Sequence, residues 1–217
     1  MSNTMKRIIG GAILAAIVVG VALLEHVGVH AVRWLAVIVA LGMITEMVLA
    51  IKRAPSTTIL SGRNIFVFFG FLAWLVVVLM SAYFVGARPW MMLLLLMIIC
   101  SADIGAWFFG KILGGDKMWE RLSPHKTWSG QIAGVICGTV ASIMYGMLGT
   151  DTFLPQLLWI GISVSLLSQY GDLTASWVKR RLGLKDFGNI IPGHGGFLDR
   201  FDGWMYALPV VWFILMQ

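Results

Sequence analysis

The chain has 217 residues, of which 59% are hydrophobic and only 12% charged, and its mean hydropathy is +0.88. Soluble globular domains carry about 25% charged residues, so this composition excludes that class and indicates an integral membrane protein. The net charge of +6 does not by itself indicate a nucleic-acid partner, because basic loops also set the orientation of membrane proteins. No nucleic-acid-binding motif is present in the sequence, and no such partner is expected.

Apolar segments long enough to cross a bilayer, ~17 to 25 residues each, recur along the whole chain. They predict an all-α fold, a polytopic transmembrane bundle of about seven spans in a single domain, 1–217. The first segment lacks a small-residue cleavage site and is expected to be a retained helix. The connection between the third and fourth segments is very short, which predicts a tight helical hairpin. The predicted spans are Ile8–Leu24, Trp34–Ile51, Ile65–Ala87, Pro89–Gly110, Ile132–Leu148, Phe153–Tyr170 and Phe201–Gln217.

The distribution of lysine and arginine predicts the orientation. With the N-terminus in the cytoplasm, 14 of the 16 Lys and Arg residues fall on the inner side, and only Arg33 and Arg88 fall outside. This asymmetry agrees with the positive-inside rule. Residues 1–88 then hold the N-terminal spans, and 89–217 hold the two polar inner loops, 111–131 and 180–200. The polar chemistry is therefore expected at the cytoplasmic face of the cell membrane.

An acidic residue near a helix end opens the candidate site. If the sixth span continues past Asp172, then Ser176, Lys179 and Arg180 lie on the same helical face. A carboxylate at membrane depth usually faces a partner or a cavity. The alternative is a helix end with a carboxylate and cations that extend toward the membrane surface.

Two further acids, Asp199 and Asp202, are three residues apart, so both can face one way. Adjacent carboxylates repel unless a cation lies between them, and Mg²⁺ binds through one or two carboxylates together with substrate phosphates. Alternatively, both acids are N-terminal helix caps, or Arg200 neutralises them.

Two loop motifs have the composition of anion sites. Glycines around His194 would let backbone N–H groups approach a phosphate, although glycine-rich turns are common. Lys126 with the hydroxyls of Ser123 and Thr127 could also hold an anion, or belong to an ordinary juxtamembrane loop. Asp103 lies within the fourth span and is either part of the site or a polar contact between helices.

These residues together resemble the phosphatidate cytidylyltransferases, also called CDP-diacylglycerol synthases. The run SWVKRRLGLKDFGNIIPGHGGFLDRFD, Ser176 to Asp202, has the family pattern Ser-x-x-Lys-Arg, Lys-Asp, then Pro-x-His-Gly-Gly-x-x-Asp-Arg-x-Asp. The resemblance covers roughly residues 90–217. The family usually has Lys at the position of His125 and an acid at the position of Ser129.

The resemblance implies transfer of CMP from CTP to phosphatidic acid, giving CDP-diacylglycerol and pyrophosphate. It implies Mg²⁺ as the cofactor, with a monovalent cation as an open second ion and a homodimer as an open assembly. The implied metal ligands are Asp172, Asp199 and Asp202. The implied catalytic residues are Asp172, Lys179, Arg180, Lys185, Asp199 and Arg200. The implied substrate-binding residues are Asp103, Ser123, Lys126, Thr127, Ser176, Asp186, His194, Gly195 and Gly196.

Two other functions stay open at this point. The same CTP chemistry could act on another lipid phosphate, such as an isoprenoid or ether lipid. A transporter that uses intramembrane acids would instead have polar residues spread through the depth of several helices, with inverted-repeat symmetry. Here the acids concentrate toward one face, which favours the enzyme.

Overall fold

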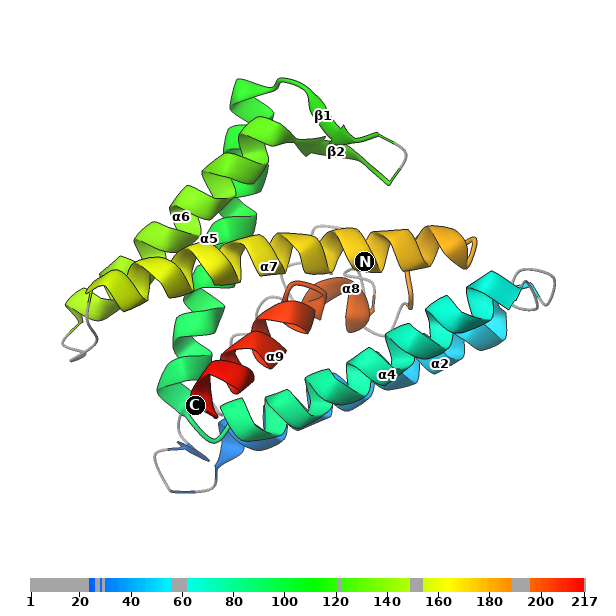
Figure 1. The fold of residues 1–217 in the computed structure, drawn as a ribbon, viewed down its shortest axis with the longest axis horizontal. Helices are drawn as coiled ribbons and strands as arrows, with labels where there is room; N and C mark the ends of the chain where they lie inside the picture. Colours follow the sequence, from blue (N-terminus) through cyan, green and yellow to red (C-terminus); the bar gives the residue numbers. More distant parts are fainter. Residues whose placement is uncertain are drawn as a thin grey trace, which may run out of the picture.

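The computed structural model describes residues 24–25, 28, 30–55, 62–120, 122–148, 154–188 and 196–216, apart from a few side chains within these ranges. Almost all of this is helical (Figure 1), so the predicted polytopic helical bundle is confirmed. The helices are α2 (Ala31–Arg53), α4 (Gly62–Val85), α5 (Pro89–Leu113), α6 (Trp128–Met147), α7 (Leu154–Arg181), α8 (Leu198–Phe201) and α9 (Trp204–Leu215).

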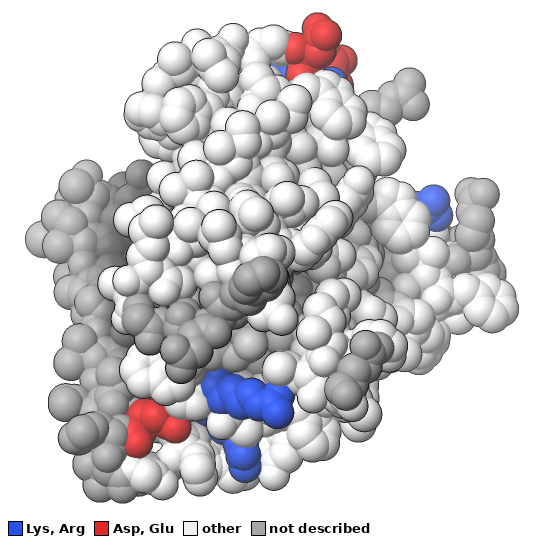
Figure 2. Space-filling model, turned by 60° about the vertical axis from the view of Figure 1, so that its left-hand side comes forward, with Lys and Arg blue, Asp and Glu red and all other residues white. Residues whose placement is uncertain are grey.

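Four of the described helices are long and apolar enough to cross a membrane: α2, α4, α5 and α6. They correspond to the second to fifth predicted spans. The first predicted span, Ile8–Leu24, lies outside the described residues except for its last residue. A space-filling view shows few charged side chains across the middle of one face, where most of the described surface is uncharged; a group of Lys and Arg side chains lies in its lower part, and acidic side chains lie at the top and lower left (Figure 2). Such a surface suits a protein surrounded by lipid.

The sixth and seventh predicted spans differ from the structure. Helix α7 continues past Tyr170 through Asp172 to Arg181, and it carries buried polar residues such as Ser168 and Gln169 that lower its apolar character. The seventh span divides at Asp202 and Gly203 into α8 and α9. Helix α9 has 12 residues and is therefore about 18 Å long, shorter than the ~30 Å hydrocarbon core.

Glycines set how closely α5 and α6 approach. Gly130, Gly134 and Gly138 form a stripe on α6, and a Cβ added to each would lie 2.6, 2.8 and 3.1 Å from backbone oxygens of α5. Only a residue without a side chain permits this approach. At the far end of the pair, the Tyr145 hydroxyl donates to the Trp90 carbonyl oxygen at 3.0 Å.

The connection between α4 and α5 is as short as predicted, since α4 ends at Val85 and α5 begins with Pro89. The two helices nevertheless do not form a tight hairpin. They diverge from the turn, and α4 packs instead against α2 and α9 (Figure 1). Proline at the first helical position starts the new helix without losing a hydrogen bond, so the chain can change direction there.

A short antiparallel hairpin interrupts the all-α prediction. Strands β1 (Lys117–Trp119) and β2 (Ser123–Thr127) lie in the predicted loop 111–131. They are too short and too polar to produce a strand pattern in the sequence. The Thr127 hydroxyl then caps α6 by accepting from the Gly130 N–H at 3.2 Å, which joins the hairpin rigidly to the α5–α6 pair.

The polar segments predicted to share one side of the membrane do lie together. Arg53 at the end of α2 donates to the Phe187 carbonyl oxygen at 3.2 Å, and Arg181 at the end of α7 donates to Asn64 Oδ1 at 3.1 Å. The β1–β2 hairpin projects over the same half of α7 (Figure 1). One end of the bundle thus brings together segments that are far apart in the sequence.

Candidate functional site

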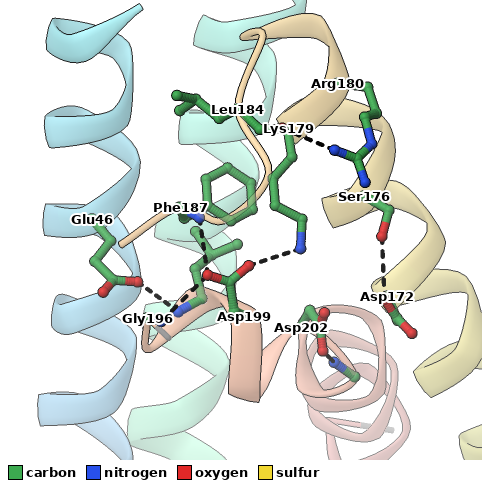
Figure 3. A network of polar contacts seen from close by, with 12 residues as sticks. Glu46, Asp172, Ser176, Lys179, Arg180, Leu184, Phe187, Gly196, Asp199 and Asp202 are labelled. Atoms are coloured by element: carbon green, nitrogen blue, oxygen red, sulfur yellow. Dashed lines mark hydrogen bonds and ion pairs between the residues drawn. The ribbon is translucent and has the colours of Figure 1, made fainter. Parts of the chain in front are cut away.

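The most enclosed ion pair joins α7 to the start of α8. Lys179 Nζ lies 2.7 Å from Asp199 Oδ1, and the two side chains are only 12% and 8% exposed. The other oxygen of Asp199 accepts two backbone N–H groups, from Phe187 at 2.9 Å and from Gly196 at 3.3 Å (Figure 3). The carboxylate is therefore held in place by one cation and two backbone amides.

The end of α7 brings Phe187 back beside Lys179. Gly183 has a φ of 72°, a left-handed conformation that glycine adopts readily. The N–H of Leu184 returns to the Lys179 carbonyl oxygen at 2.9 Å, which closes the helix in a glycine-terminated turn. Phe187 follows, fully buried and stacked on Phe71 of α4, and its ring lies 5.5 Å from Lys179 Nζ.

A second pair joins the hairpin to α7. Lys126 Nζ lies 2.5 Å from Asp172 Oδ2, and these side chains are 26% and 40% exposed. Ser176, one turn further along α7, donates to Asp172 Oδ1 at 3.4 Å. Ser176 points toward Asp172 and Lys179 toward Asp199 (Figure 3), so Asp172, Ser176 and Lys179 share the predicted face of α7, whereas Arg180 turns to the Leu184 carbonyl oxygen.

Asp202 lies in the turn between α8 and α9, close to Asp172. Gly171 makes this approach possible, since a Cβ added there would overlap the Asp202 backbone oxygen. Burial, followed by repulsion from the Asp172 and Asp103 carboxylates, raises the pKa of the Asp202 carboxyl well above its usual range, and Lys179 and Lys126 oppose this shift. Three carboxyls from α5, α7 and the α8–α9 turn therefore influence one another.

Glu46 belongs to none of the sequence motifs, yet it is fully buried on α2 and contacts the site at Leu198. Its Oε2 accepts the Leu198 N–H at 2.9 Å, one residue before Asp199. Its intramembrane position was the only signal in the sequence, because an acid buried at membrane depth is costly and usually functional. The partner could not be found from a local pattern, since it lies 152 positions away.

The other predicted site residues have varied surroundings. Thr127 is 5% exposed and its hydroxyl is engaged in the α6 cap and with Ser129, so it points into the protein. Arg180 is exposed and donates to the Leu184 carbonyl oxygen. Lys185, Asp186 and Arg200 are exposed at the same end of the bundle, Ser123 is half-buried in β2, and Asp103 is exposed on α5. His194 and Gly195 lie outside the described residues, and Gly196 is buried.

Within the described part of the chain, no group of three or more His, Cys, Asp or Glu side chains is placed to hold a metal ion. Asp199 is paired with Lys179 and Asp172 with Lys126. The Asp202 backbone lies against Gly171, so Asp172 and Asp202 are neighbouring acids. Two carboxylates fit the preference of Mg²⁺, which takes one or two protein carboxylates and completes its shell with phosphates and water.

Comparison with known proteins gives a match along the whole chain. The family model described as the cytidylyltransferase family matches residues 2–217. The chain belongs to this family. Membership agrees with a helical membrane bundle whose cationic and acidic side chains gather at one end.

Curated relatives agree with this family assignment. Phosphatidate cytidylyltransferases of Staphylococcus saprophyticus and of Staphylococcus aureus strain COL are each 41% identical to the chain over 122 residues. That of Staphylococcus epidermidis is 40% identical over 124 residues. Each match covers 56% of this chain and 47% of the relative, so the aligned region spans about half the length of these family members.

Proposed function

We propose that the protein transfers CMP from CTP to phosphatidic acid, forming CDP-diacylglycerol and pyrophosphate in phospholipid biosynthesis. The observation that carries the proposal is the cluster of Lys126, Asp172, Lys179, Asp199 and Asp202 at one end of the helical bundle. The names of the aligned relatives support the choice of substrates.

The chemistry needs little proton transfer. A phosphate monoester has a second pKa of ~6, so the attacking phosphatidate oxygen is mostly ionised at neutral pH. It forms a bond to the α-phosphorus of CTP while the bond to the pyrophosphate oxygen breaks. The barrier comes from bringing two polyanions together and stabilising the leaving pyrophosphate, which calls for fixed cations.

The lysines are suited to that task. Each is already held against a carboxylate, so its position is defined before substrate arrives. Lys126 belongs to the hairpin and Lys179 to α7, and a polyanion between them would contact both. Arg180, Lys185 and Arg200 add exposed positive charge at the same end of the bundle, and the predicted glycine segment, with His194 and Gly195, would supply backbone donors.

A divalent cation, Mg²⁺ by the resemblance, would neutralise the carboxylates and the phosphates together. Asp172 and Asp202 are the pair best placed to hold it, with Asp103 nearby. Asp172 would exchange its contact with Lys126 on binding the cation, and Asp199 would join only by exchanging its contact with Lys179. A monovalent second cation and a homodimer belong to the same proposal, through the resemblance alone.

The site is proposed to face the cytoplasm from the inner membrane. CTP is soluble and cytoplasmic, and the phosphatidate headgroup lies in the inner leaflet, so both reach this end of the bundle. The basic residues at this end agree with the positive-inside rule.

Purified protein in detergent with labelled CTP and a panel of lipid phosphates tests the function. We expect CDP-lipid from phosphatidic acid that disappears when Mg²⁺ is chelated and returns when it is added back. Asp199→Asn should lower turnover at least ~100-fold at unchanged protein level. Turnover of an isoprenoid phosphate in preference to phosphatidic acid would reassign the acceptor, and full activity of Asp199→Asn would contradict the site.

A further inference from the structure

Glu46, the buried glutamate of α2, contacts residues of the family motif between Ser176 and Asp202. We define the neck as the two short segments 187–188 and 196–198, which flank residues 189–195 in the sequence. Besides the hydrogen bond from Leu198, two glycines of the neck lie against Glu46. A Cβ added to Gly188 or to Gly196 would overlap a Glu46 carboxylate oxygen, so neither position admits a larger residue without a shift.

Helix α2 contacts the neck at two further points on the same face. Arg53 donates to the Phe187 carbonyl oxygen at 3.2 Å, and the Phe197 ring packs against Gly42, where a Cβ would lie 3.1 Å from it. The Phe187 N–H goes to Asp199. Both backbone groups of Phe187 are thus bound by side chains, one from α2 and one from α8.

Two carboxylates therefore close the neck from opposite sides. Asp199 accepts from Phe187 and Gly196, and Glu46 accepts from Leu198 while lying against Gly188 and Gly196 (Figure 3). The Oε1 atom of Glu46 is buried and has no hydrogen-bond partner among the described residues. A buried carboxylate that is only partly satisfied is expensive, and a side chain used only for packing would be cheaper as an apolar residue.

We propose that Glu46 is a positioning residue, which closes the neck together with Asp199 and so holds the Asp199–Lys179 pair in place for the phosphates of the nucleotide. The proposal rests on the proposed function for its substrate. It places the N-terminal helix α2, which carries none of the family motif, within the architecture of the site.

The test uses Glu46→Met in the full-length protein, with Glu46→Gln as the conservative variant and Thr45→Val as the matched control. Met has a similar volume and removes the unpartnered Oε1, which offsets the loss of the acceptor for the Leu198 N–H, so the fold should be retained. Thr45 is the neighbouring residue, and its exposed hydroxyl donates to the Leu41 carbonyl oxygen within α2. A purely structural role would lower the thermal midpoint and the activity together.

We expect Glu46→Met to raise the KM for CTP at least tenfold without lowering the thermal midpoint, and Glu46→Gln to recover much of this loss because its amide oxygen can still accept the Leu198 N–H. Hydrogen exchange at the Leu198 amide, measured by mass spectrometry, should accelerate at least tenfold in Glu46→Met and stay unchanged in Thr45→Val.

Unchanged exchange at Leu198 would overturn the closure of the neck. A KM for CTP within threefold of the wild type in Glu46→Met, or a thermal midpoint that falls in step with activity, would overturn the positioning role. If the unmodified protein failed to use CTP, the proposed function would fail, and the exchange measurement would still decide whether Glu46 closes the neck.

Discussion

The two lysine–carboxylate pairs have similar geometry but different surroundings. Lys179 and Asp199 are almost enclosed, whereas Lys126 and Asp172 are substantially open. Removing one partner of a buried pair leaves a desolvated charge and costs ~3–5 kcal/mol, while an exposed pair contributes about 0–1 kcal/mol.

Lys179→Met should therefore lower the free energy of unfolding by about 3 kcal/mol. The two backbone N–H groups that still donate to Asp199 would reduce this loss. Lys126→Met should lower it by less than about 1 kcal/mol. Thermal unfolding in detergent, followed by tryptophan fluorescence, measures both. Equal effects of the two substitutions would mean that the difference in burial does not determine their contributions. Adding Asp199→Asn to Lys179→Met should restore part of the loss.

Gly171 is the residue that allows the α8–α9 turn to approach Asp172. In Gly171→Ala the new methyl would meet the Asp202 backbone oxygen, so the turn must move and the Asp172–Asp202 pair must separate. We expect CTP turnover to fall at least tenfold and the requirement for Mg²⁺ to shift to higher concentration.

Gly70→Ala is the matched control for Gly171→Ala. Gly70 is a helical glycine on α4, and nothing lies within 4 Å of the place that an alanine methyl would take. Alanine there should stabilise the helix by about 0.5–1 kcal/mol and leave turnover unchanged. A wild-type metal requirement in Gly171→Ala would contradict the role given to Gly171.

At the scale of elements, the α5–α6 pair is the frame that carries the hairpin. Its close approach depends on the glycine stripe of α6, where Gly134 lies against the Ala102 backbone oxygen and Gln169 Nε2. Lipid offers no hydrophobic driving force between helices, so this packing must come from contact.

Gly134→Ala should destabilise the pair by about 1–3 kcal/mol through overpacking. The expected observation is a lower thermal midpoint together with weaker CTP turnover, because the hairpin and Lys126 move with α6. Ile136→Ala, on the exposed face of the same helix, should change neither by much. A neutral Gly134→Ala would show that the helices can separate without affecting the site.

The sequence predicted some elements well and others poorly, for physical reasons. Helices α2, α4, α5 and α6 were predictable because a span of lipid length needs a continuous apolar run. The continuation of α7 through Asp172 could be predicted only conditionally: if the helix continued, the spacing of its polar residues would place them on one face. The β1–β2 hairpin was not, since its strands are too short to show a period. The break at Asp202 was not predicted either, because the contact with Gly171 that accompanies it is long-range.

The same distinction applies to the site. Asp172, Ser176, Lys179 and Asp199 were found because their spacing is local or belongs to a motif. Glu46 was missed because its role depends on a contact between distant parts of the chain. The pairing of Asp199 with Lys179, and of Asp172 with Lys126, also required three-dimensional information, since Lys126 and Asp199 each lie in a different segment of the sequence from their partners.

At the scale of the whole molecule, the bundle has a polar end and an opposite end that carries Arg33 and Arg88. Single cysteines in a background without Cys100 and Cys137 test the orientation. We expect Lys117→Cys and Lys185→Cys to react with a membrane-impermeant thiol reagent only in inside-out vesicles, and Arg88→Cys only in intact spheroplasts. Labelling of Arg88→Cys and Lys185→Cys from the same side would contradict the topology.

The hydrogen bond between Leu198 and Glu46 also has a temporal consequence. A ribosome delivers α2 to the membrane early, and Leu198 emerges 152 residues later. Until then the Glu46 carboxylate cannot accept the hydrogen bond from the Leu198 N–H. A nascent chain stalled before α8 would therefore carry a glutamate in α2 without this partner. Incomplete chains would thus differ chemically from finished ones at Glu46.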